Sequence, residues 1–535
     1  MAQKKTPGVY IVEKNAFPNS VVEVPTAVPA FIGYTQRAEN GTKPLNKKPW
    51  RISSMLEYET YFGFGPDVKY GLTAVDDPKT EAYDLKLAAP NEGNDGTEMK
   101  AYALTVENAK KDFFLYNSIR HFFANGGGPC YIVSVGTYDD EISKDDMEAG
   151  LGELLLEDEP TMLVMPEAIR LPEDECIALQ QAMLNQCGKL MSRVSILDVY
   201  DGYKPRTHPD GDVIDAFRDN LATNFPSYGM AYYPWLNTSV VSSSEVSFTS
   251  IEPVADLQAA LEAELEASYL HIEEVKGSEP NDLTPEQQHM KKDLKNYKAI
   301  KAELAKLGEE ENQKDPKREI LHQTLNVVSD GYRESMEAVQ KKMNLLPPSP
   351  AMAGVYTLTD NTRGVWKAPA NMAMSSVISP AVNISHDDQE DLNVTPQGKS
   401  INAIRSFVGE GIKVWGARTI DGNSQDWRYV NVRRTMIMLE QSIKKAAKAY
   451  VFEPNTANTW TTMKAMITNF LTDKWKEGAL VGAVPSDAFQ VSVGLGSTMT
   501  ANDILDGYMN ITVLVAISRP AEFIVITFQQ QMQKS

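Results

Sequence analysis

Serine, threonine and histidine are the residue types in this chain that could support hydrolysis. The segment Gly496-Ser-Thr-Met-Thr-Ala501 superficially resembles the nucleophile loop of a serine protease, in which an activated hydroxyl attacks a carbonyl carbon. The order of Ser and Thr is wrong for such a loop, and Thr500 with Asp503 has the spacing of a helix capping box. Capping accounts for these residues without catalysis. We therefore assign no catalytic residue.

Metal and nucleotide sites are not indicated by residue spacing either. Gly398-Lys399-Ser400 matches only the end of a phosphate-binding loop, because position 393 is Asn where that loop requires glycine. Gly63-Phe-Gly65 lacks the third glycine of a dinucleotide-binding turn. The histidines contain no HxxxH or HxH pair that could bind a metal; they are His121, His208, His271, His289, His322 and His386. We expect no cofactor and no bound metal.

The length of the chain indicates several domains, and its net charge argues against a nucleic-acid-binding protein. A chain of 535 residues is too long for one ordinary core and indicates two to four domains. A net charge of −20 argues against nucleic acid as a direct partner, since phosphate binding needs concentrated Lys and Arg. Residues 401–535, however, contain fourteen Lys and Arg against eleven Asp and Glu. We expect an acidic partner to dock on this C-terminal part.

Cysteine usage and hydrophobicity bear on where the chain folds. Cys130, Cys176 and Cys187 are too few for a disulfide framework and form no CxxC pair, so we expect buried free thiols. The N-terminus has no apolar signal-peptide region, and no apolar run approaches the length of a membrane span. These features favour folding in the cytoplasm without membrane insertion.

The pattern of elements divides the chain into four parts. Residues 1–23 read as an arm, and residues 24–105 read as a small β-rich domain interrupted by Pro and Gly. Apolar strands alternate with amphipathic helices in residues 106–397, which predicts an α/β domain with a largely parallel sheet. Within it, residues 255–346 are rich in charge and in helix formers, which predicts solvated helices on the outside.

Residues 398–535 are expected to form an α+β domain. Helices are predicted over residues 430–450 and 458–477, a strand over 489–493, a short helix over 502–506 and two strands over 511–518 and 523–528. The linker Arg519-Pro-Ala-Glu522 has no tight-turn residues, so the last strand need not fold back on the one before it.

Both termini carry short strands that could detach from the body. The N-terminal strand contains Val9, Tyr10, Ile11 and Val12, and the C-terminal strand contains Phe523, Ile524, Val525, Ile526, Thr527 and Phe528. An apolar strand at a chain end leaves an open edge that soluble proteins usually cover. We therefore predict that these ten residues pair with strands of neighbouring chains.

The terminal segments also carry a resemblance to a known family. Pro7-Gly-Val-Tyr-Ile, Val24-Pro-Thr-Ala-Val-Pro-Ala-Phe-Ile-Gly33 and Arg519-Pro-Ala-Glu-Phe-Ile-Val resemble the tail sheath proteins of contractile phages and related contractile injection systems. Further similar segments follow in the same order along most of the chain: Phe122-Phe-Ala-Asn-Gly-Gly-Gly-Pro-Cys-Tyr131, Tyr232-Tyr-Pro-Trp-Leu236, Leu346-Pro-Pro-Ser349, Asn361-Thr-Arg-Gly-Val-Trp-Lys-Ala-Pro-Ala370, Gly398-Lys-Ser-Ile-Asn-Ala-Ile-Arg405 and Val414-Trp-Gly-Ala-Arg-Thr419. Their order and spacing together make the resemblance specific.

The resemblance implies a structural subunit and not an enzyme. It implies a subtilisin-like fold without a catalytic triad for the α/β domain, and exchange of the terminal strands between subunits in sixfold rings. Such rings stack around an inner tube and contract once to drive the tube through a target envelope. The implied partners are further copies of the chain, the inner tube protein, and baseplate and terminal cap proteins. The implied location is the bacterial cytoplasm during assembly, then a virion tail or an injection particle.

A sheath must hold its tube, and exposed basic residues of the C-terminal domain are the candidates for this contact. The helix over 430–450 and the helix over 458–477 carry the eight candidates: Arg433, Arg434, Lys444, Lys445 and Lys448 on the first, and Lys464, Lys474 and Lys476 on the second. We favour the second helix, because Trp460 and Phe470 can seat it on the terminal sheet while its lysines project.

Two alternatives stay open at the level of sequence. One is an α/β hydrolase or protease with appended domains, which would remain a small oligomer and would not form tubes. The other is one half of a two-protein sheath, as in type VI secretion, which the presence of all matched segments in one chain disfavours. Sequence does not distinguish a phage from a bacterial injection particle.

Overall fold

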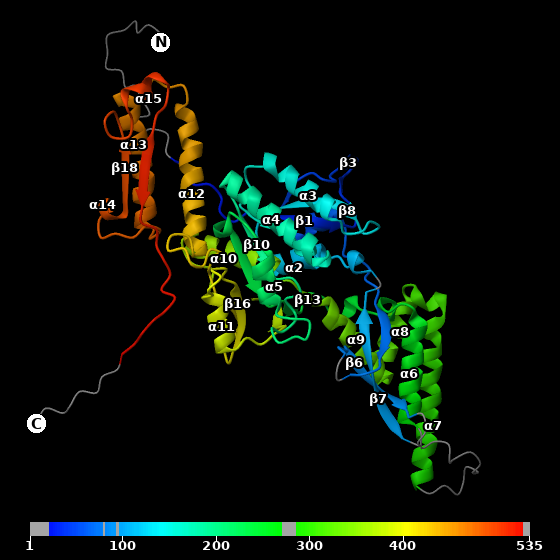
Figure 1. Cartoon of the computed structure of the whole chain (residues 1–535). Helices are drawn as coiled ribbons and strands as arrows, with labels where there is room; N and C mark the ends of the chain where they lie inside the picture. The colour runs from blue at the N-terminus through cyan, green and yellow to red at the C-terminus, as the bar shows by residue number, and fades with distance from the viewer. Residues whose placement is uncertain (1–20, 79–80, 92–95, 107, 270–284, 528–535) are drawn as a thin grey trace, which may run out of the picture.

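The computed structural model describes residues 21–78, 81–91, 96–106, 108–269 and 285–527. These residues form three bodies that lie side by side in space (Figure 1). The middle body is an α/β domain built on a nine-stranded sheet. A helical lobe with a small sheet lies on one side of it, and a C-terminal domain lies on the other. The mixed α/β and α+β multidomain architecture that the sequence indicates is confirmed.

The nine-stranded sheet has the order β14-β17-β16-β11-β10-β9-β1-β8-β4. Its six inner strands, from β16 to β8, are parallel, and β4, β17 and β14 pair antiparallel at the two sides. In chain order the strands are β1 Pro29–Thr35, β4 Trp50–Ile52, β8 Cys130–Thr137, β9 Met162–Val164, β10 Val194–Asp198, β11 Gly229–Tyr233, β14 Met372–Ala373, β16 Asn402–Phe407 and β17 Gly411–Val414.

Helices cover both faces of this sheet, as parallel strands require. α3 and α4 pack together against β1, β8 and β10, and α2 and α10 pack together on β1, β9 and β10. All seven residues of β1 are buried, which is the pattern of a strand covered on both sides. The helices of this domain are α1 Met55–Phe62, α2 Leu115–Ala124, α3 Lys144–Glu153, α4 Glu173–Leu190, α5 Val213–Asn220, α10 Ser349–Arg363 and α11 His386–Asn393.

The expected β-rich domain over residues 24–105 is wrong. Strand β1 lies between β8 and β9 in the large sheet, and β4 pairs with β8 at its edge. The remaining strands of that range, β5 Gly71–Val75, β6 Leu85–Pro90 and β7 Thr97–Thr105, form a separate three-stranded sheet. The sequence indicated short strands in this range, but β1 and β4 find their partners far away along the chain.

The charged helices of residues 255–346 pack with that separate sheet around one core. They are α6 Val254–Ser268, α7 Pro285–Leu304, α8 Lys317–Val328 and α9 Asp330–Met343. Their apolar residues, including Leu257, Leu261 and Leu265, share a core with Leu72, Leu87 and Leu104 of the three strands. The prediction that these helices only decorate the α/β domain is therefore wrong. They form half of an independent lobe, which we call the outer lobe.

Short strands join these parts. β12 Leu236–Thr238 pairs with β13 Leu345–Leu346 and β15 Val377–Pro380 at the junction of the outer lobe and the α/β domain. β2 Glu39–Asn40 and β3 Lys43–Pro44 form a surface hairpin. Asn344 reinforces the junction, because its side chain accepts from Thr238 and Val241 and donates to the Val241 carbonyl.

The C-terminal domain combines helices with a two-stranded antiparallel sheet. Its elements are α12 Val430–Ala447, α13 Ala457–Lys476, α14 Pro485–Ala488, β18 Phe489–Val493, α15 Ala501–Leu505 and β19 Ile511–Val515. Apolar residues of α12 and α13 pack with those of β18 in a third core. The expected boundary at residue 398 is displaced, because β16 and β17 belong to the large sheet. The predicted helices and the strands over 489–493 and 511–518 are present within a few residues of their expected ends.

Candidate assembly surfaces

The sheet of the C-terminal domain has two open edges. β18 and β19 pair only with each other among the described strands, so each presents one unpaired row of N–H and C=O groups. An exposed strand edge is a template for another strand. Two further strands can therefore add to this sheet, one at each side.

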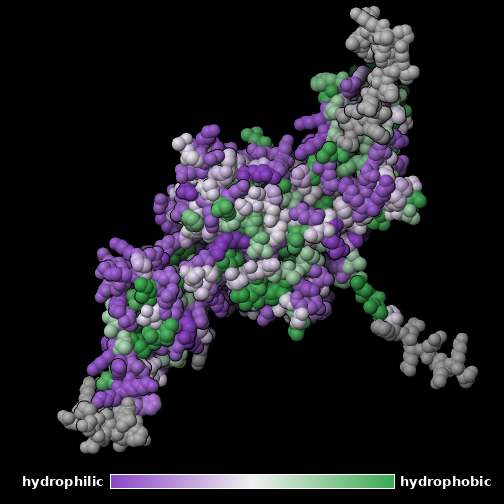
Figure 2. Space-filling view, turned by 180° about the vertical axis from the view of Figure 1, so that it is seen from behind, coloured by the Kyte–Doolittle hydropathy of each residue, from purple (hydrophilic) through white to green (hydrophobic). Residues whose placement is uncertain are grey.

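The described part of the C-terminal tail has no regular structure and is strongly exposed. Phe523, Ile524, Val525 and Ile526 are between 70% and 89% exposed, and Figure 2 shows apolar side chains along the start of this projecting tail. The strand expected over 523–528 has no partner among the described residues, and Phe528 lies outside them. The other exchange candidates, Val9, Tyr10, Ile11 and Val12, also lie outside the described residues.

The N-terminal arm leaves the body at a fixed point. Lys474 of α13 donates to the Glu23 carboxylate, and the Val24 amide donates to Ser442 Oγ of α12 at 3.0 Å. The Thr26 hydroxyl donates to Asp360 Oδ2 at 2.7 Å. These contacts hold the root of the arm between the C-terminal domain and α10.

Three of the eight candidate tube-contact residues are not available for such a contact. Arg433 is buried, with its guanidinium 3.7 Å from the Trp427 ring centre. Arg434 is buried in an ion pair with Asp360 at 2.6 Å. Lys474 is buried between Glu23 and Glu477. Helical periodicity identifies charged positions but not their partners, and for these three residues the prediction of an exposed contact is wrong.

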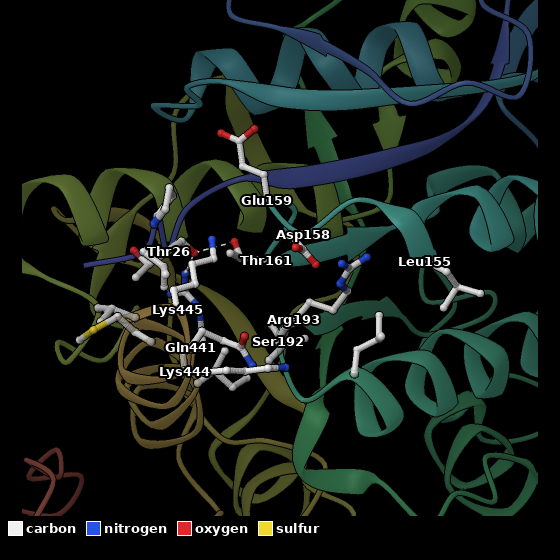
Figure 3. A pocket seen from close by; sticks show the side chains of 18 of the residues that line it. Thr26, Leu155, Asp158, Glu159, Thr161, Ser192, Arg193, Gln441, Lys444 and Lys445 are labelled. Carbon is white, nitrogen blue, oxygen red and sulfur yellow. Dashed lines mark hydrogen bonds between the residues drawn. The ribbon is translucent and has the colours of Figure 1, made fainter. Parts of the chain in front are cut away.

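The five remaining candidates are exposed. Lys464 and Lys476 lie on α13, and Lys476 makes a long contact of 3.5 Å with Asp473. Lys444 and Lys445 lie on α12, and Lys448 lies on the 3₁₀ turn that follows it. All three line one wall of a cleft of about 210 Å³ (Figure 3). The opposite wall is formed by the α/β domain and carries Leu155, Asp158, Glu159 and Arg193.

Residues considered for catalysis have structural roles. The Thr500 hydroxyl accepts from the Asp503 amide and the Asp503 carboxylate accepts from the Thr500 amide, so the expected capping box of α15 is confirmed. Burial lowers the pKa of His121 to about 4, which keeps its ring neutral. Among the described residues no group of three or more His, Cys, Asp or Glu side chains could hold a metal.

Buried hydroxyl and carboxyl groups also stabilise the fold. The Asp198 carboxylate at the end of β10 accepts from both the amide and the hydroxyl of Ser349, at 2.8 and 2.5 Å, and so caps α10. Glu167 accepts three backbone N–H groups, from Tyr34, Phe114 and Leu115. Sequence analysis missed both carboxylates, because their partners lie more than fifty residues away along the chain.

The three cysteines agree with expectation. Cys130, Cys176 and Cys187 are buried free thiols, and burial raises the pKa of Cys187 to about 12. A search of the described helices finds none that is both long and apolar enough to cross a membrane.

The chain is similar in sequence to phage tail sheath proteins. The family model of the phage tail sheath C-terminal domain matches residues 423–531. The tail sheath protein of Vibrio phage KVP40 is 26% identical over 153 residues, and that of Enterobacteria phage T4 is 23% identical over 126 residues. These alignments cover 28% and 24% of this chain but only 22% and 19% of the relatives, so the chain matches about a fifth of their length.

Solved structures extend the similarity to the whole chain. The contracted helical sheath of the anti-feeding prophage has a TM-score of 0.55 and 25% identity, and the match covers 99% of this chain and 100% of that one. The contracted sheath complex of the extracellular contractile injection system PVC has a TM-score of 0.57 and 24% identity, with 99% of both chains covered.

The family model, the curated relatives and the solved sheath structures agree that this chain is similar to one class of protein, the subunits of contractile sheaths. The resemblance to contractile tail sheath proteins is confirmed, over residues 423–531 by sequence and along the whole chain by fold. The comparisons support a structural sheath role and not the hydrolase alternative.

Proposed function

We propose that the chain is a structural subunit of a contractile sheath. Many copies polymerise as stacked rings around an inner tube and contract once to drive the tube through a target envelope. The observation that carries this proposal is the match of the whole chain to sheath subunits, together with a C-terminal sheet that has two open edges.

Exchange of terminal strands joins the subunits in this proposal. Residues Val9–Val12 of one neighbour and Phe523–Phe528 of another add to the open edges of β18 and β19. Each added strand gains a handful of backbone hydrogen bonds, each of about 1 kcal/mol net, and buries apolar side chains that are now exposed. Two open edges and two terminal strands match in number, so every subunit can be both donor and acceptor.

During contraction in this proposal, the subunits move relative to one another while the exchanged strands keep them connected. The assembled sheath is held in an extended lattice by a kinetic barrier, and it passes to a shorter and wider lattice with more contact between subunits. The energy is stored at assembly, so no nucleotide is required. The exchanged strands keep neighbours connected while the α/β domains and outer lobes rotate.

The grip on the inner tube comes from repeated weak contacts in the C-terminal domain. The exposed lysines Lys464 and Lys476 of α13 are the favoured contacts. The second choice is Lys444 and Lys445 of α12 with Lys448 directly after it. Exposed ion pairs contribute about 0.2–1 kcal/mol each, so their sum over many rings binds the tube firmly. Because each contact is weak, the tube can be released one ring at a time.

The α/β domain takes a subtilisin-like fold in this proposal, without a catalytic triad and without enzymatic activity. Fold similarity does not carry activity with it. The chain forms the sheath alone and not as half of a two-protein sheath. Assembly takes place in the bacterial cytoplasm, and the sheath then becomes part of a virion tail or an injection particle with its baseplate and terminal cap proteins.

Deletion of residues 523–535 tests strand exchange. The described residues of this segment are exposed and outside the cores, so the truncated subunit should fold with an unchanged melting temperature. Negative-stain microscopy should show long tubes for the parent and none for the truncated chain. Deletion of residues 1–15 should have the same effect. Normal tubes from both truncated chains would exclude strand exchange, and absence of tubes from the parent under all conditions would exclude the sheath function.

A further inference from the structure

A short strap carries the chain from β19 to the α/β domain. Beyond Val515 the chain continues beside residues 479–481, where the Ser518 amide donates to the Ala479 carbonyl at 3.0 Å. The buried Asn431 of α12 donates to the Ser518 carbonyl at 2.9 Å. Four residues later the strap ends at Glu522, the last residue before the exposed apolar tail.

Glu522 is held by three side chains of the α/β domain and of the loop that leads to α12. Arg418 donates to both carboxylate oxygens, with Nη2 to Oε2 at 2.6 Å and Nε to Oε1 at 3.0 Å. Tyr429 Oη donates to Oε2 at 3.0 Å, and Asn393 Nδ2 donates to Oε1 at 2.7 Å. We call these four residues the tail anchor.

The tail anchor is a partly buried cluster in which the charges of Arg418 and Glu522 are paired. The Arg418 side chain is 4% exposed and that of Glu522 is 20% exposed, which shields their ion pair from solvent. Arg418 is also fixed from behind, because its Nη1 donates to the Asn393 carbonyl and its amide donates to Asn402 Oδ1. These contacts hold the guanidinium of Arg418 and the carboxylate of Glu522 in one bidentate arrangement. The position from which the tail begins, at Glu522, is therefore fixed relative to the α/β domain.

The anchor joins two of the sequence segments that carry the family resemblance. Arg418 lies in Val414-Trp-Gly-Ala-Arg-Thr419, and Glu522 lies in Arg519-Pro-Ala-Glu-Phe-Ile-Val. Neither residue belongs to the open-edged sheet or to the exposed lysines, so neither proposed surface accounts for them. Their contact gives both charged residues a common role.

The position of the anchor bears on where the tail can pair. The paired part of the strap ends at Ser518, and residues 519–522 are enough for a hairpin loop of four residues. Without a constraint, the apolar residues from Phe523 onward could fold back on the open edge of their own β19. That pairing would fill the edge that a neighbouring chain needs.

We propose that the tail anchor prevents this self-pairing and so directs the C-terminal strand to another copy of the chain. The inference rests on the proposed strand exchange. Glu522 and Arg418 are positioning residues, which act by holding the tail on the α/β domain and away from its own sheet. Fixing the tail at its root also lowers the entropy that is lost when the strand is captured.

A distance measurement on the unassembled chain tests the anchor directly. Thr512→Cys on β19 and Thr527→Cys on the tail place two spin labels at exposed positions, and the three native cysteines are buried. With the parent anchor, the distance between the labels should have no short population. Glu522→Gln should add a short population that corresponds to the tail lying on β19. Tyr429→Phe removes one donor and should give a smaller short population.

Assembly of the same variants, without labels, gives the second readout. The critical concentration for tube formation should rise at least about tenfold for Glu522→Gln, as expected for the loss of charge-assisted hydrogen bonds. Glu453→Gln changes an exposed glutamate of the C-terminal domain and should behave as the parent. Thermal melting should confirm that each variant is folded.

The outcomes separate the two proposals. If Glu522→Gln matches the parent in both label distance and critical concentration, the anchor has no role in directing the tail. If the short population appears but the critical concentration is unchanged, self-pairing does not compete with exchange and the inference is overturned. If the parent forms no tubes, the sheath function fails, while the distance measurement still decides whether the anchor holds the tail.

Discussion

Glu522 stays ionised in the tail anchor because its partners outweigh the cost of burial. Burial alone would raise the pKa of the Glu522 carboxyl, but the hydrogen bonds from Arg418, Asn393 and Tyr429 and the charge of Arg418 hold it below the ordinary value of 4.5. A carboxyl whose pKa is lower in the anchored state stabilises that state above its ordinary pKa. This stabilisation is lost as the pH falls through the lower, anchored pKa.

The tail should therefore be released by acid. A spin label at Thr527→Cys should keep constant mobility from pH 8 to about pH 5 and become more mobile only below the ordinary carboxyl pKa. Burial raises the pKa of Tyr429 above its ordinary value, so its hydroxyl stays protonated in this range. Glu522→Gln should show high mobility at every pH, and circular dichroism should verify that the chain remains folded. A pH step of the same size in Glu522→Gln would assign the release to a different group.

At the scale of elements, the sequence predicted local structure well and long-range packing poorly. The strand over 489–493 and the helices α12 and α13 follow from periodicity and from β-branched content, which are properties of neighbouring residues. The partners of β1 and of α6 depend on residues about a hundred or more positions away. The spacing of Leu257, Leu261 and Leu265 indicates a buried face on α6, but it does not indicate which sheet covers that face.

The outer lobe should unfold as a unit separate from the α/β domain, because its core shares no buried residue with the larger one. Leu261→Ala removes a fully buried side chain from the lobe and should cost about 2–5 kcal/mol in that unit alone. Calorimetry should show two transitions, with only one lowered by this substitution. Leu184→Ala on α4 is the matched control and should lower the other transition. A single transition shifted by both substitutions would show that the two bodies unfold together.

At the scale of the whole molecule, both chain ends leave the body at an ion pair whose basic partner is buried. Glu23 meets Lys474 at the root of the N-terminal arm, and Glu522 meets Arg418 at the root of the tail. The sequence predicted the terminal strands from their composition but not these roots, which join residues 451 and 104 positions apart. In the proposed strand exchange, fixed roots would transmit force between an exchanged strand and the body, so that movement of one subunit is passed to its neighbours.

In the proposed function, the exposed lysines of the C-terminal domain bind the sheath to its inner tube. Arg433, Arg434 and Lys474 are excluded as contacts, because each is buried against a partner in its own chain. The remaining candidates are the exposed lysines on or next to α12 and α13. Charge reversal at one helix at a time shows which set of lysines contacts the tube. Lys464→Glu with Lys476→Glu changes α13 alone. Lys444→Glu with Lys445→Glu and Lys448→Glu changes only the end of α12 and the turn after it, and we call this the α12 variant.

Reversal on α13 should give sheaths that polymerise but lose the inner tube or contract early. Exposed ion pairs weaken as salt screens them, so the grip of the parent should also fall between low and high ionic strength. Co-sedimentation of tube protein with sheath over a salt series measures both effects, and the α12 variant serves as the control. If the α13 variant retains its tube at every ionic strength while the α12 variant loses it, the tube is held by the lysines that line the cleft on α12.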